Sequence, residues 1–380
     1  MACFLTSCKN TAPSPTESTV VKAPETGQLL NYDEAGTARL AKKLRNSGDE
    51  LTHIVVIGDS HTAADFLSGH IRTQLQRQFG NGGAGFISPL SVQGNRYSNV
   101  HFSKASGWAV ENSRRRQNSA FTLGGNIATP TSASNYVEIS LTDGETASQV
   151  QALYRAQGSG LLNLQHKAVV LADTQGEWRL SEPVRVPPTF SVSLSGNNVQ
   201  LGGFWLISPE RYGVIVSALG INGAQILMPD KWPADWAGIL GQLHPDLVVL
   251  AYGTNEAFNT DLSLDEYRQT LRRQIGKIRQ SSPEAAIMLI GPGSSIKNKS
   301  GIGCAQRQSP LLEPIIGVQK EVARSDHTLF WNWFDFMGGA CSIEQWAVKG
   351  LARPDLIHLS AEGYQLSANG FWRAFSGQLN

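Results

Sequence analysis

The stretch Ile54-Val55-Val56-Ile57-Gly58-Asp59-Ser60 constrains the fold of this 380-residue chain more than any other. Four consecutive branched apolar residues favour a strand that is covered on both faces, as in a parallel sheet. Gly58 allows a sharp turn, and Asp59 and Ser60 are residue types that begin helices. Ser60 is therefore expected at the carboxyl end of a strand and the amino end of a helix, where ligands of open α/β sheets bind.

A helix is expected directly after this turn, because apolar side chains recur at spacings near three or four from residue 62 to residue 79. The same alternation of strand and helix returns in the second half of the chain. Strands are predicted at 213–219, 246–251, 286–290 and 328–333, and helices at 33–46, 264–278, 311–323 and 361–375. Strands that alternate with helices predict an α/β domain with a parallel sheet, helices on both faces and right-handed crossovers.

Between the two α/β segments, from about Tyr97 to Leu206, the helical periodicity disappears and short strand-like runs replace it. These runs lie at 136–141, 149–154, 168–172, 190–194 and 199–207, and turn residues separate them. Regular short strands with such turns predict an all-β sandwich. We therefore divide the chain into a signal remnant and linker at 1–28, one α/β domain in two parts at 29–96 and 208–380, and an inserted β-sandwich module at 97–207.

The first residues end in Leu5-Thr6-Ser7-Cys8, which resembles the end of a bacterial lipoprotein signal with Cys8 as the lipidated residue. A complete signal would have a charged segment and a longer apolar run before the cysteine. The alternative is a disordered amino terminus that carries two chance cysteines. Residues 9–27 are rich in Pro, Thr, Ser and Lys, a composition typical of a linker that forms no core.

Composition and cysteine spacing exclude several classes of function. Charged residues make up 17% of the chain, against roughly 25% in ordinary soluble proteins, and the net charge is +1. This balance gives no reason to expect a nucleic-acid partner, and no run of about 18 apolar residues is present to span a membrane as a helix. Cysteine and histidine do not cluster at metal-ligand spacing, so neither a metal nor a cofactor is predicted. Cys304 and Cys341 lie in glycine-containing loop sequence, and we predict that they form a disulfide in an oxidising compartment.

Three other features of the sequence have structural interpretations. The glycine-dense run at 80–85 is expected to be a flexible surface loop, because no Gly-Lys-Ser/Thr follows that would form a phosphate-binding loop. Arg114-Arg115-Arg116 is expected to be a solvated loop, with contact to glycan or cell wall as the alternative. Trp108, Trp178 and Trp205 are expected to fill the core of the β module, although aromatic rings in such modules can also stack on sugars. Trp331 and Trp333 are expected to alternate on one strand and pack in the core.

Polar residues at the ends of the predicted strands form a set suited to nucleophilic catalysis. A nucleophilic serine needs a base, the base needs an orienting carboxylate, and the tetrahedral intermediate needs hydrogen-bond donors for its oxyanion. His358 is the candidate base for Ser60, and Asp355, three residues earlier, can hold the other ring nitrogen. The backbone N–H groups of Ser60 and Gly223 and the side-chain amide of Asn255 are the candidate oxyanion donors.

Each of these residues also has a plain structural interpretation. Ser60 can be a helix cap, His358 a core histidine, and Asp355, Gly223 and Asn255 turn residues. However, the four motifs that carry these residues occur together, each after a predicted strand or before the last helix. This combination favours catalysis over four separate structural roles. His61 and Asp65, with His53 nearby, can also be considered as metal ligands, but no motif supports that, and we interpret them as packing residues around the site.

The motifs Gly58-Asp59-Ser60, Gly223, Gly253-Thr254-Asn255 and Asp355-x-x-His358 resemble those of the SGNH (GDSL-type) hydrolases in order and spacing. The resemblance implies a flavodoxin-like α/β/α sandwich with Ser60, His358 and Asp355 as a catalytic triad and Ser60, Gly223 and Asn255 as oxyanion donors. Glu256 is a departure, because the family often has Asp there; we expect it to support the loop.

A closer resemblance is to bacterial peptidoglycan O-acetylesterases. It rests on the following runs: Gly58-Asp59-Ser60-His61-Thr62-Ala63, Ile221-Asn222-Gly223-Ala224, Gly253-Thr254-Asn255-Glu256 and Phe336-Met337-Gly338-Gly339. The inserted β module, which is similar to a carbohydrate-binding module in that group, adds to the resemblance.

This resemblance implies a periplasmic serine esterase that removes acetyl groups from the 6-hydroxyl of muramoyl residues in O-acetylated peptidoglycan. It acts through an acetyl-enzyme, without metal or cofactor. We expect the protein to be a monomer. A lipid anchor at Cys8, if present, would attach it to the outer membrane. The first alternative keeps the triad and changes the substrate or acceptor, as in a lipase, an acetylxylan-type esterase or an O-acetyltransferase. The second is a non-catalytic glycan-binding protein.

Overall fold

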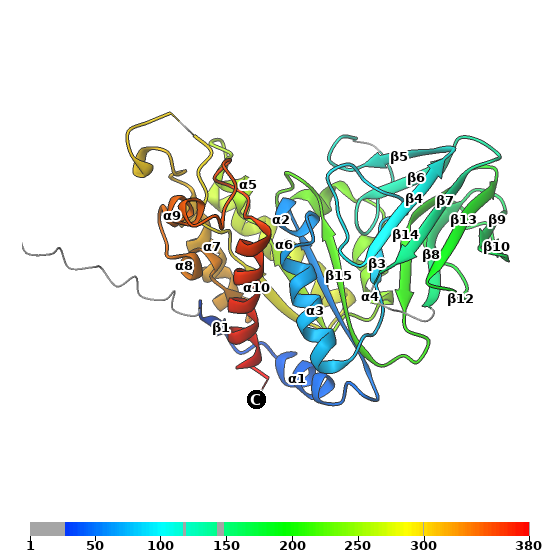
Figure 1. The fold of residues 1–380 in the computed structure, drawn as a ribbon, viewed down its shortest axis with the longest axis horizontal. Helices are drawn as coiled ribbons and strands as arrows, with labels where there is room; N and C mark the ends of the chain where they lie inside the picture. The colour runs from blue at the N-terminus through cyan, green and yellow to red at the C-terminus, as the bar shows by residue number, and fades with distance from the viewer. Residues whose placement is uncertain (1–26, 117–118, 143–147, 299, 380) are drawn as a thin grey trace, which may run out of the picture.

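The structure is a computed structural model that describes residues 27–116, 119–142, 148–298 and 300–379. Cys8 and nearly all of the predicted linker lie outside the described residues. Two bodies lie side by side: a six-stranded sheet flanked by helices, and a module of two antiparallel sheets (Figure 1). None of the helices among the described residues is both long and apolar enough to cross a membrane.

The six-stranded sheet has the strand order that places ligand sites at one edge. It runs β1 (Leu29–Asn31), β18 (Leu329–Trp331), β17 (Ala286–Ile290), β16 (Leu247–Ala251), β2 (Leu51–Gly58) and β15 (Gly213–Gly220). β1 is antiparallel to β18, and the other five strands are parallel. In chain order the parallel strands are arranged 2-1-3-4-5, the flavodoxin-like order. The direction of winding reverses between β2 and β16, and ligands of such sheets bind at the carboxyl ends of the strands at this reversal.

Helices cover both faces of this sheet because its strands are apolar on both sides. In β2, Ile54 and Val56 belong to one buried cluster, whereas Val55 and Ile57 belong to the other. The first face is covered by α1 (Thr37–Arg45), α3 (Leu67–Phe79) and α10 (Ala361–Ser376). The second is covered by α4 (Trp236–Gln242), α6 (Leu264–Ser281) and α7 (Leu312–Ser325). The predicted parallel sheet with helices on both faces is therefore confirmed.

Short helices follow several strands of this sheet. They are α2 (Ser60–Ala63), α5 (Thr254–Ala257) and α8 (Trp333–Met337). A further short helix, α9 (Ser342–Val348), follows α8, and the 3-10 turns are η1 (Met228–Lys231) and η2 (Cys304–Gln306). Trp333 begins α8, so the strand predicted at 328–333 ends two residues early, although Trp331 and Trp333 are both buried as expected.

The β module is a sandwich of two antiparallel sheets. One contains β4 (Val100–Ser106), β7 (Tyr136–Leu141), β9 (Gly160–Leu164), β10 (Lys167–Leu171) and β13 (Thr189–Gly196). The other contains β3 (Gly85–Ile87), β5 (Trp108–Asn112), β6 (Asn126–Pro130), β8 (Ser148–Ala156), β11 (Arg179–Leu180), β12 (Val184–Val186) and β14 (Val199–Ile207). Inward side chains of both sheets form one buried cluster. β3 pairs with β14, so the second sheet takes in a strand that precedes the predicted start at residue 97.

The module and the α/β body share a hydrophobic core. Trp178 and Trp205 are buried in the cluster that also contains Ile215 of β15 and Ile239 of α4. Trp108 is partly buried against the module's own core. The tryptophans therefore fill cores, as expected, and two of them join the bodies. Such continuity of apolar packing holds the module in a fixed position on the α/β body.

Two local predictions were wrong. The glycine-dense run is buried from Gly82 onwards, because Gly83, with φ of 121°, passes so close to β14 that a Cβ would lie 2.7 Å from Ile207 Cα. The helix predicted from residue 62 to 79 is broken between α2 and α3. At the break Asp65 has φ of 49°, and its buried carboxylate accepts hydrogen bonds from Arg72 and Ser68.

Candidate active site

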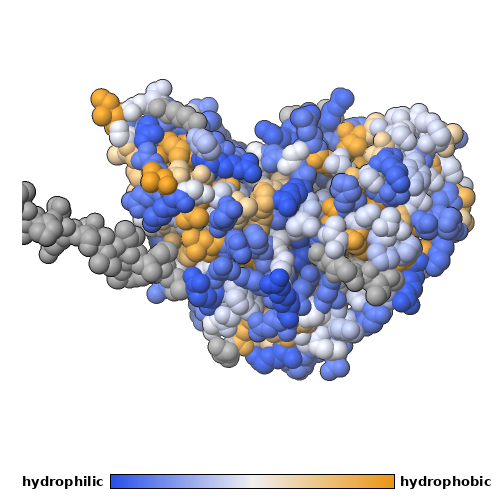
Figure 2. Space-filling view, viewed as in Figure 1, coloured by the Kyte–Doolittle hydropathy of each residue, from blue (hydrophilic) through white to orange (hydrophobic). Residues whose placement is uncertain are grey.

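Ser60 is the first residue of α2, at the carboxyl end of β2. The turn that places it there needs glycine, because a Cβ at Gly58 would come within 2.7 Å of the Ala251 carbonyl oxygen on the neighbouring strand. Asp59 caps α2, and its Oδ1 accepts the N–H of His61 at 2.9 Å. Ser60 thus has the strand-end and helix-start position that the sequence predicts. The outline of the molecule is indented above α2 and α5 (Figure 2).

A continuous line of hydrogen bonds joins Ser60, His358 and Asp355. Ser60 Oγ lies 2.9 Å from His358 Nε2, and His358 Nδ1 lies 2.9 Å from Asp355 Oδ2. The other carboxylate oxygen, Oδ1, accepts the backbone N–H groups of Ile357 and His358, each at 2.9 Å. The structure therefore brings together three residues that are up to 298 positions apart in sequence.

The carboxyl of Asp355 is held in its charged form. Partial burial pushes its pKa upward, but the hydrogen bonds from the backbone and ring of His358 and from the Ile357 N–H outweigh burial and lower the pKa below its usual range. A charged Asp355 favours the His358 tautomer that has its proton on Nδ1. Nε2 then faces Ser60 with a free lone pair and can accept the hydroxyl proton.

Gly223 and Asn255 lie beside this line of residues. Asn255, in α5, donates its side-chain amide to the Ala224 carbonyl at 2.9 Å and to Asp59 Oδ2 at 3.4 Å. Its amide therefore links the residue before Ser60 to the residue after Gly223. Gly223 has φ of 72°, a conformation that favours glycine. All three predicted oxyanion donors thus meet at one edge of the sheet, while their role is still a prediction.

Two carboxyl groups under the site, those of Asp59 and Glu256, are buried, which the sequence does not predict. Burial raises the pKa of Asp59 to about 7 and that of Glu256 to about 7. Glu256 Oε1 accepts the Ile226 N–H at 2.6 Å, and its Oε2 accepts the Gly253 N–H at 3.0 Å. Glu256 therefore supports the loops that carry Gly223 and Asn255, in agreement with the expectation. The position of Glu256 directly after Asn255 indicates that it belongs to the site loop, but the sequence does not reveal that its carboxyl is buried.

His61 packs beside His358. Its Nδ1 lies 2.8 Å from the Tyr364 hydroxyl, and its ring centroid lies 5.4 Å from that of His358. Burial lowers the pKa of His61 to about 3, so the ring is neutral at ordinary pH. His53 instead contacts Ser217 and the Leu243 carbonyl on the far end of β2.

No group of three or more His, Cys, Asp or Glu side chains is arranged to hold a metal in the part of the chain that the structure describes. His61, Asp65 and His53 each have their own hydrogen-bond or ion-pair partners, in Tyr364, Arg72 and Ser217. His61 packs beside His358, as interpreted, whereas His53 lies at the opposite end of β2.

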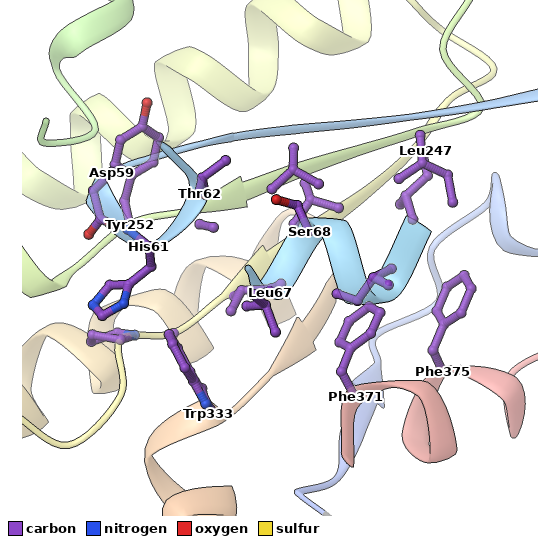
Figure 3. A pocket seen from close by; sticks show the side chains of 18 of the residues that line it. Asp59, His61, Thr62, Leu67, Ser68, Leu247, Tyr252, Trp333, Phe371 and Phe375 are labelled. Atoms are coloured by element: carbon purple, nitrogen blue, oxygen red, sulfur yellow. Dashed lines mark hydrogen bonds between the residues drawn. The ribbon is translucent and has the colours of Figure 1, made fainter. Parts of the chain in front are cut away.

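A small apolar cavity lies between the sheet and α3 and α10, below His61. Its walls include Leu67 and Trp333, with Phe371 and Phe375 of α10 on the side away from the sheet (Figure 3). Its volume is about 30 Å³. Ser60 is not among the residues that line this cavity, so the cavity does not open onto the candidate nucleophile.

The predicted disulfide between Cys304 and Cys341 is present, with the two Cα atoms 5.8 Å apart. It joins η2 to the start of α9. Gln308 connects this region to the site, because its side chain accepts the Cys341 N–H at 2.9 Å and its backbone bridges to Ile296. Ile296 N–H in turn donates to the Leu356 carbonyl, at 2.8 Å, within the turn that carries Asp355 and His358.

Comparison with known proteins identifies the family. The model of the GDSL-like lipase/acylhydrolase family matches residues 202–366, and that of the peptidoglycan O-acetylesterase N-terminal domain matches residues 82–189. A solved structure titled "Peptidoglycan O-acetylesterase in action, 5 min" shares 32% sequence identity with a TM-score of 0.83, covering 92% of this chain and 99% of that one.

The chain belongs to the peptidoglycan O-acetylesterase family. Like the GDSL-like acylhydrolases, it is a carboxylic ester hydrolase, and its α/β fold with an added β-rich module is confirmed by the same comparisons. An acetyl xylan esterase is 20% identical over 43% of this chain and 82% of its own, with a TM-score of 0.33. A family two carbohydrate esterase from Clostridium thermocellum is 12% identical over 64% of this chain and 92% of its own, with a TM-score of 0.31. No curated protein matches this esterase.

Proposed function

We propose that the protein is a serine esterase that removes O-acetyl groups from the 6-hydroxyl of muramoyl residues in peptidoglycan. The observation that carries this proposal is the hydrogen-bonded line from Ser60 Oγ through His358 to Asp355, in a member of the peptidoglycan O-acetylesterase family. This geometry supports nucleophilic attack without a metal, because the base already faces the hydroxyl that it must deprotonate.

In the first half of the proposed reaction, Ser60 Oγ attacks the acetyl carbonyl carbon and passes its proton to His358 Nε2. Asp355 stabilises the imidazolium through Oδ2. The backbone N–H groups of Ser60 and Gly223 and the amide of Asn255 stabilise the oxyanion. Asn255 can exchange its long bond to Asp59 for the oxyanion and keep the shorter bond to Ala224. When the tetrahedral intermediate collapses, the bond to the sugar oxygen breaks and His358 gives that oxygen the proton.

In the second half, water attacks the acetyl-enzyme carbonyl and His358 takes a proton from it. The second tetrahedral intermediate collapses, acetate leaves, and Ser60 regains its proton from His358. If a sugar hydroxyl replaced water at this step, the protein would be an O-acetyltransferase, so the identity of the acceptor must be measured.

The test is acetate release from O-acetylated sacculi, compared with chemically de-acetylated sacculi. The wild-type protein should release acetate from the first only, and Ser60→Ala and His358→Ala should release none while they unfold at the wild-type temperature. A sulfonyl fluoride should label Ser60 in the wild-type protein. Ser134→Ala, an exposed serine on the β module, serves as the matched control. Acetate release by Ser60→Ala at the wild-type rate would reject the mechanism, and transfer of acetyl to added sugar would indicate the transferase.

We also propose that the protein works in the periplasm as a monomer, with Cys8 as a site of lipid attachment. The disulfide between Cys304 and Cys341 supports an oxidising compartment. Cell fractionation tests the proposal. The wild-type protein should be found with the membranes and Cys8→Ser in the soluble periplasmic fraction, whereas identical distribution of the two proteins would exclude a lipid anchor at Cys8. Light scattering of the purified protein tests the monomer.

A further inference from the structure

A groove of about 550 Å³ lies at the junction of the two bodies, beside the loop that carries Gly223. The groove is lined by residues 91–93 and Asn95, by residues 109–112 of β5, and by residues 114–116, while Ile221 and Asn222 contribute from the α/β body. Asn222 directly precedes Gly223 in the chain. The groove therefore lies next to the loop of the predicted oxyanion donor and extends onto the β module.

Three consecutive arginines of the β module line this groove. Arg114 lies against Gly223 itself, since a Cβ at Gly223 would be 2.9 Å from Arg114 Nη2. Arg115 Nη2 donates to Gln93 Oε1 at 3.0 Å across the groove. The side chains of all three arginines are exposed. The segment expected to be a solvated loop thus folds back onto the active-site loop.

The positive charge in the groove is largely uncompensated. Glu111 is the acidic residue among those that line it, and its carboxylate accepts a hydrogen bond from Ser119 Oγ at 2.8 Å. Within the described ranges, no carboxylate lies within ion-pair distance of Arg114, Arg115 or Arg116. Guanidinium groups bind planar carboxylates through two parallel hydrogen bonds, which makes arginine the preferred residue for that ligand.

We propose that this groove binds a carboxylate on the acidic side arm of the muramoyl residue whose acetyl group is at Ser60. The inference rests on the proposed function and adds a specificity determinant to it. The acetyl ester and the lactyl side arm, with any peptide attached, are substituents of the same sugar ring. One ring can therefore place the ester at Ser60 and the carboxylate beside Arg114, so that the β module recognises substrate as part of the active site.

The test compares kcat/KM for three O-acetylated muramoyl substrates. The first carries a stem peptide with free carboxylates, the second the same peptide with its carboxylates converted to amides, and the third a free lactyl carboxylate without peptide. Charge-assisted pairing predicts that the wild-type enzyme prefers the first substrate over the second roughly tenfold. The third substrate shows whether the lactyl group or the peptide supplies the carboxylate.

The double variant Arg115→Gln plus Arg116→Gln should bring the ratio between the first two substrates close to one. Arg114→Gln should lower the same ratio. Arg179→Gln, an exposed arginine on β11 outside the groove, is the matched control and should keep the wild-type ratio. Wild-type ratios near one for both the first and the third substrate against the second, or ratios that the double variant does not change, would overturn the inference.

Failure of the proposed function can be distinguished from failure of this inference. If the wild-type protein releases no acetate from any substrate, the function is wrong, and the groove is tested by calorimetry on Ser60→Ala. Binding that favours the free-carboxylate peptide over its amidated form, and that the double variant abolishes, would support the groove. Equal binding of the two peptides would reject it.

Discussion

Asp355 holds His358 with both of its carboxylate oxygens: Oδ2 contacts the ring Nδ1 and Oδ1 accepts the backbone N–H, each at 2.9 Å. The backbone bond fixes the carboxylate relative to the main chain, and the side-chain bond then fixes the ring. Leu356, between the two residues, has φ of 58°, so the short turn depends on a left-handed residue other than glycine. The orientation of the His358 ring is therefore set within four consecutive residues.

Asp355→Asn should lower kcat for acetate release by about 10³- to 10⁴-fold. The asparagine can keep the backbone bond through its oxygen, but its amide would donate toward Nδ1 and favour the tautomer with a protonated Nε2, which cannot accept the Ser60 proton. Steady-state acetate release measures the effect. Asp261→Asn, at an exposed loop position, is the control. Near-wild-type activity in Asp355→Asn would mean that a water or another carboxylate orients His358.

The residues of this site could be predicted because each follows a strand of a parallel sheet or precedes the last helix. Ser60, Gly223 and Asn255 come after β2, β15 and β16, and the carboxyl ends of neighbouring parallel strands meet at one edge. Strand and helix types were recognised from apolar periodicity, and β7, β14 and β17 have the predicted bounds.

The features that sequence did not reveal depend on tertiary contacts. β1 has three residues and is a strand because it pairs with β18, the last of the parallel strands. Asp59 and Glu256 are ordinary acidic residues in sequence, and only the packing of loops over them raises their pKa values. From the sequence alone, the arginines at 114–116 are predicted to be solvated, because their neighbours in the chain do not indicate that Arg114 lies against Gly223.

Glu256→Gln should destabilise the protein, and the loss should be larger at pH 5 than at pH 8. Both carboxylate oxygens accept backbone N–H groups, so an amide would place one donor against another. Burial raises the pKa of Glu256 from 4.5 to about 7 in the folded state, so the folded protein binds the proton more tightly than the unfolded chain. The stability from this group is therefore present below pH 4.5 and is lost as pH rises through 7, by at most about 1.4 kcal/mol per pH unit.

Urea unfolding of wild-type protein and Glu256→Gln at several pH values between 5 and 8 measures this difference. The comparison between the two proteins cancels the contributions of His53 and His61, whose lowered pKa values act in the opposite direction. A difference in the free energy of unfolding that stays constant across this range would show that Glu256 does not bind the proton more tightly in the folded state.

Tyr364→Phe should reduce stability by about 1–3 kcal/mol, because it leaves the buried His61 Nδ1 without its hydrogen-bond partner. His61 packs 5.4 Å from the His358 ring, so a looser His61 should also lower kcat for acetate release. Chemical unfolding and acetate release are measured together. Tyr212→Phe, at a more exposed tyrosine, is the control. If Tyr364→Phe is less stable but has the wild-type kcat, the predicted effect of His61 on kcat is wrong and His61 has only a structural role.

The disulfide between Cys304 and Cys341 closes a loop of 37 positions, and its removal should destabilise the protein by about 2–4 kcal/mol. The double variant Cys304→Ser plus Cys341→Ser should therefore unfold at lower urea concentration than the oxidised wild-type protein. Addition of a reductant should lower the midpoint of the wild-type protein and leave that of the variant unchanged. Hydrogen bonds link the disulfide region through Gln308 and Ile296 to Leu356, in the turn that carries Asp355 and His358. Loss of the disulfide should therefore disturb this turn, so that kcat falls in the variant while KM changes little. Two free thiols at Cys304 and Cys341, counted under denaturing non-reducing conditions, would contradict the bond itself.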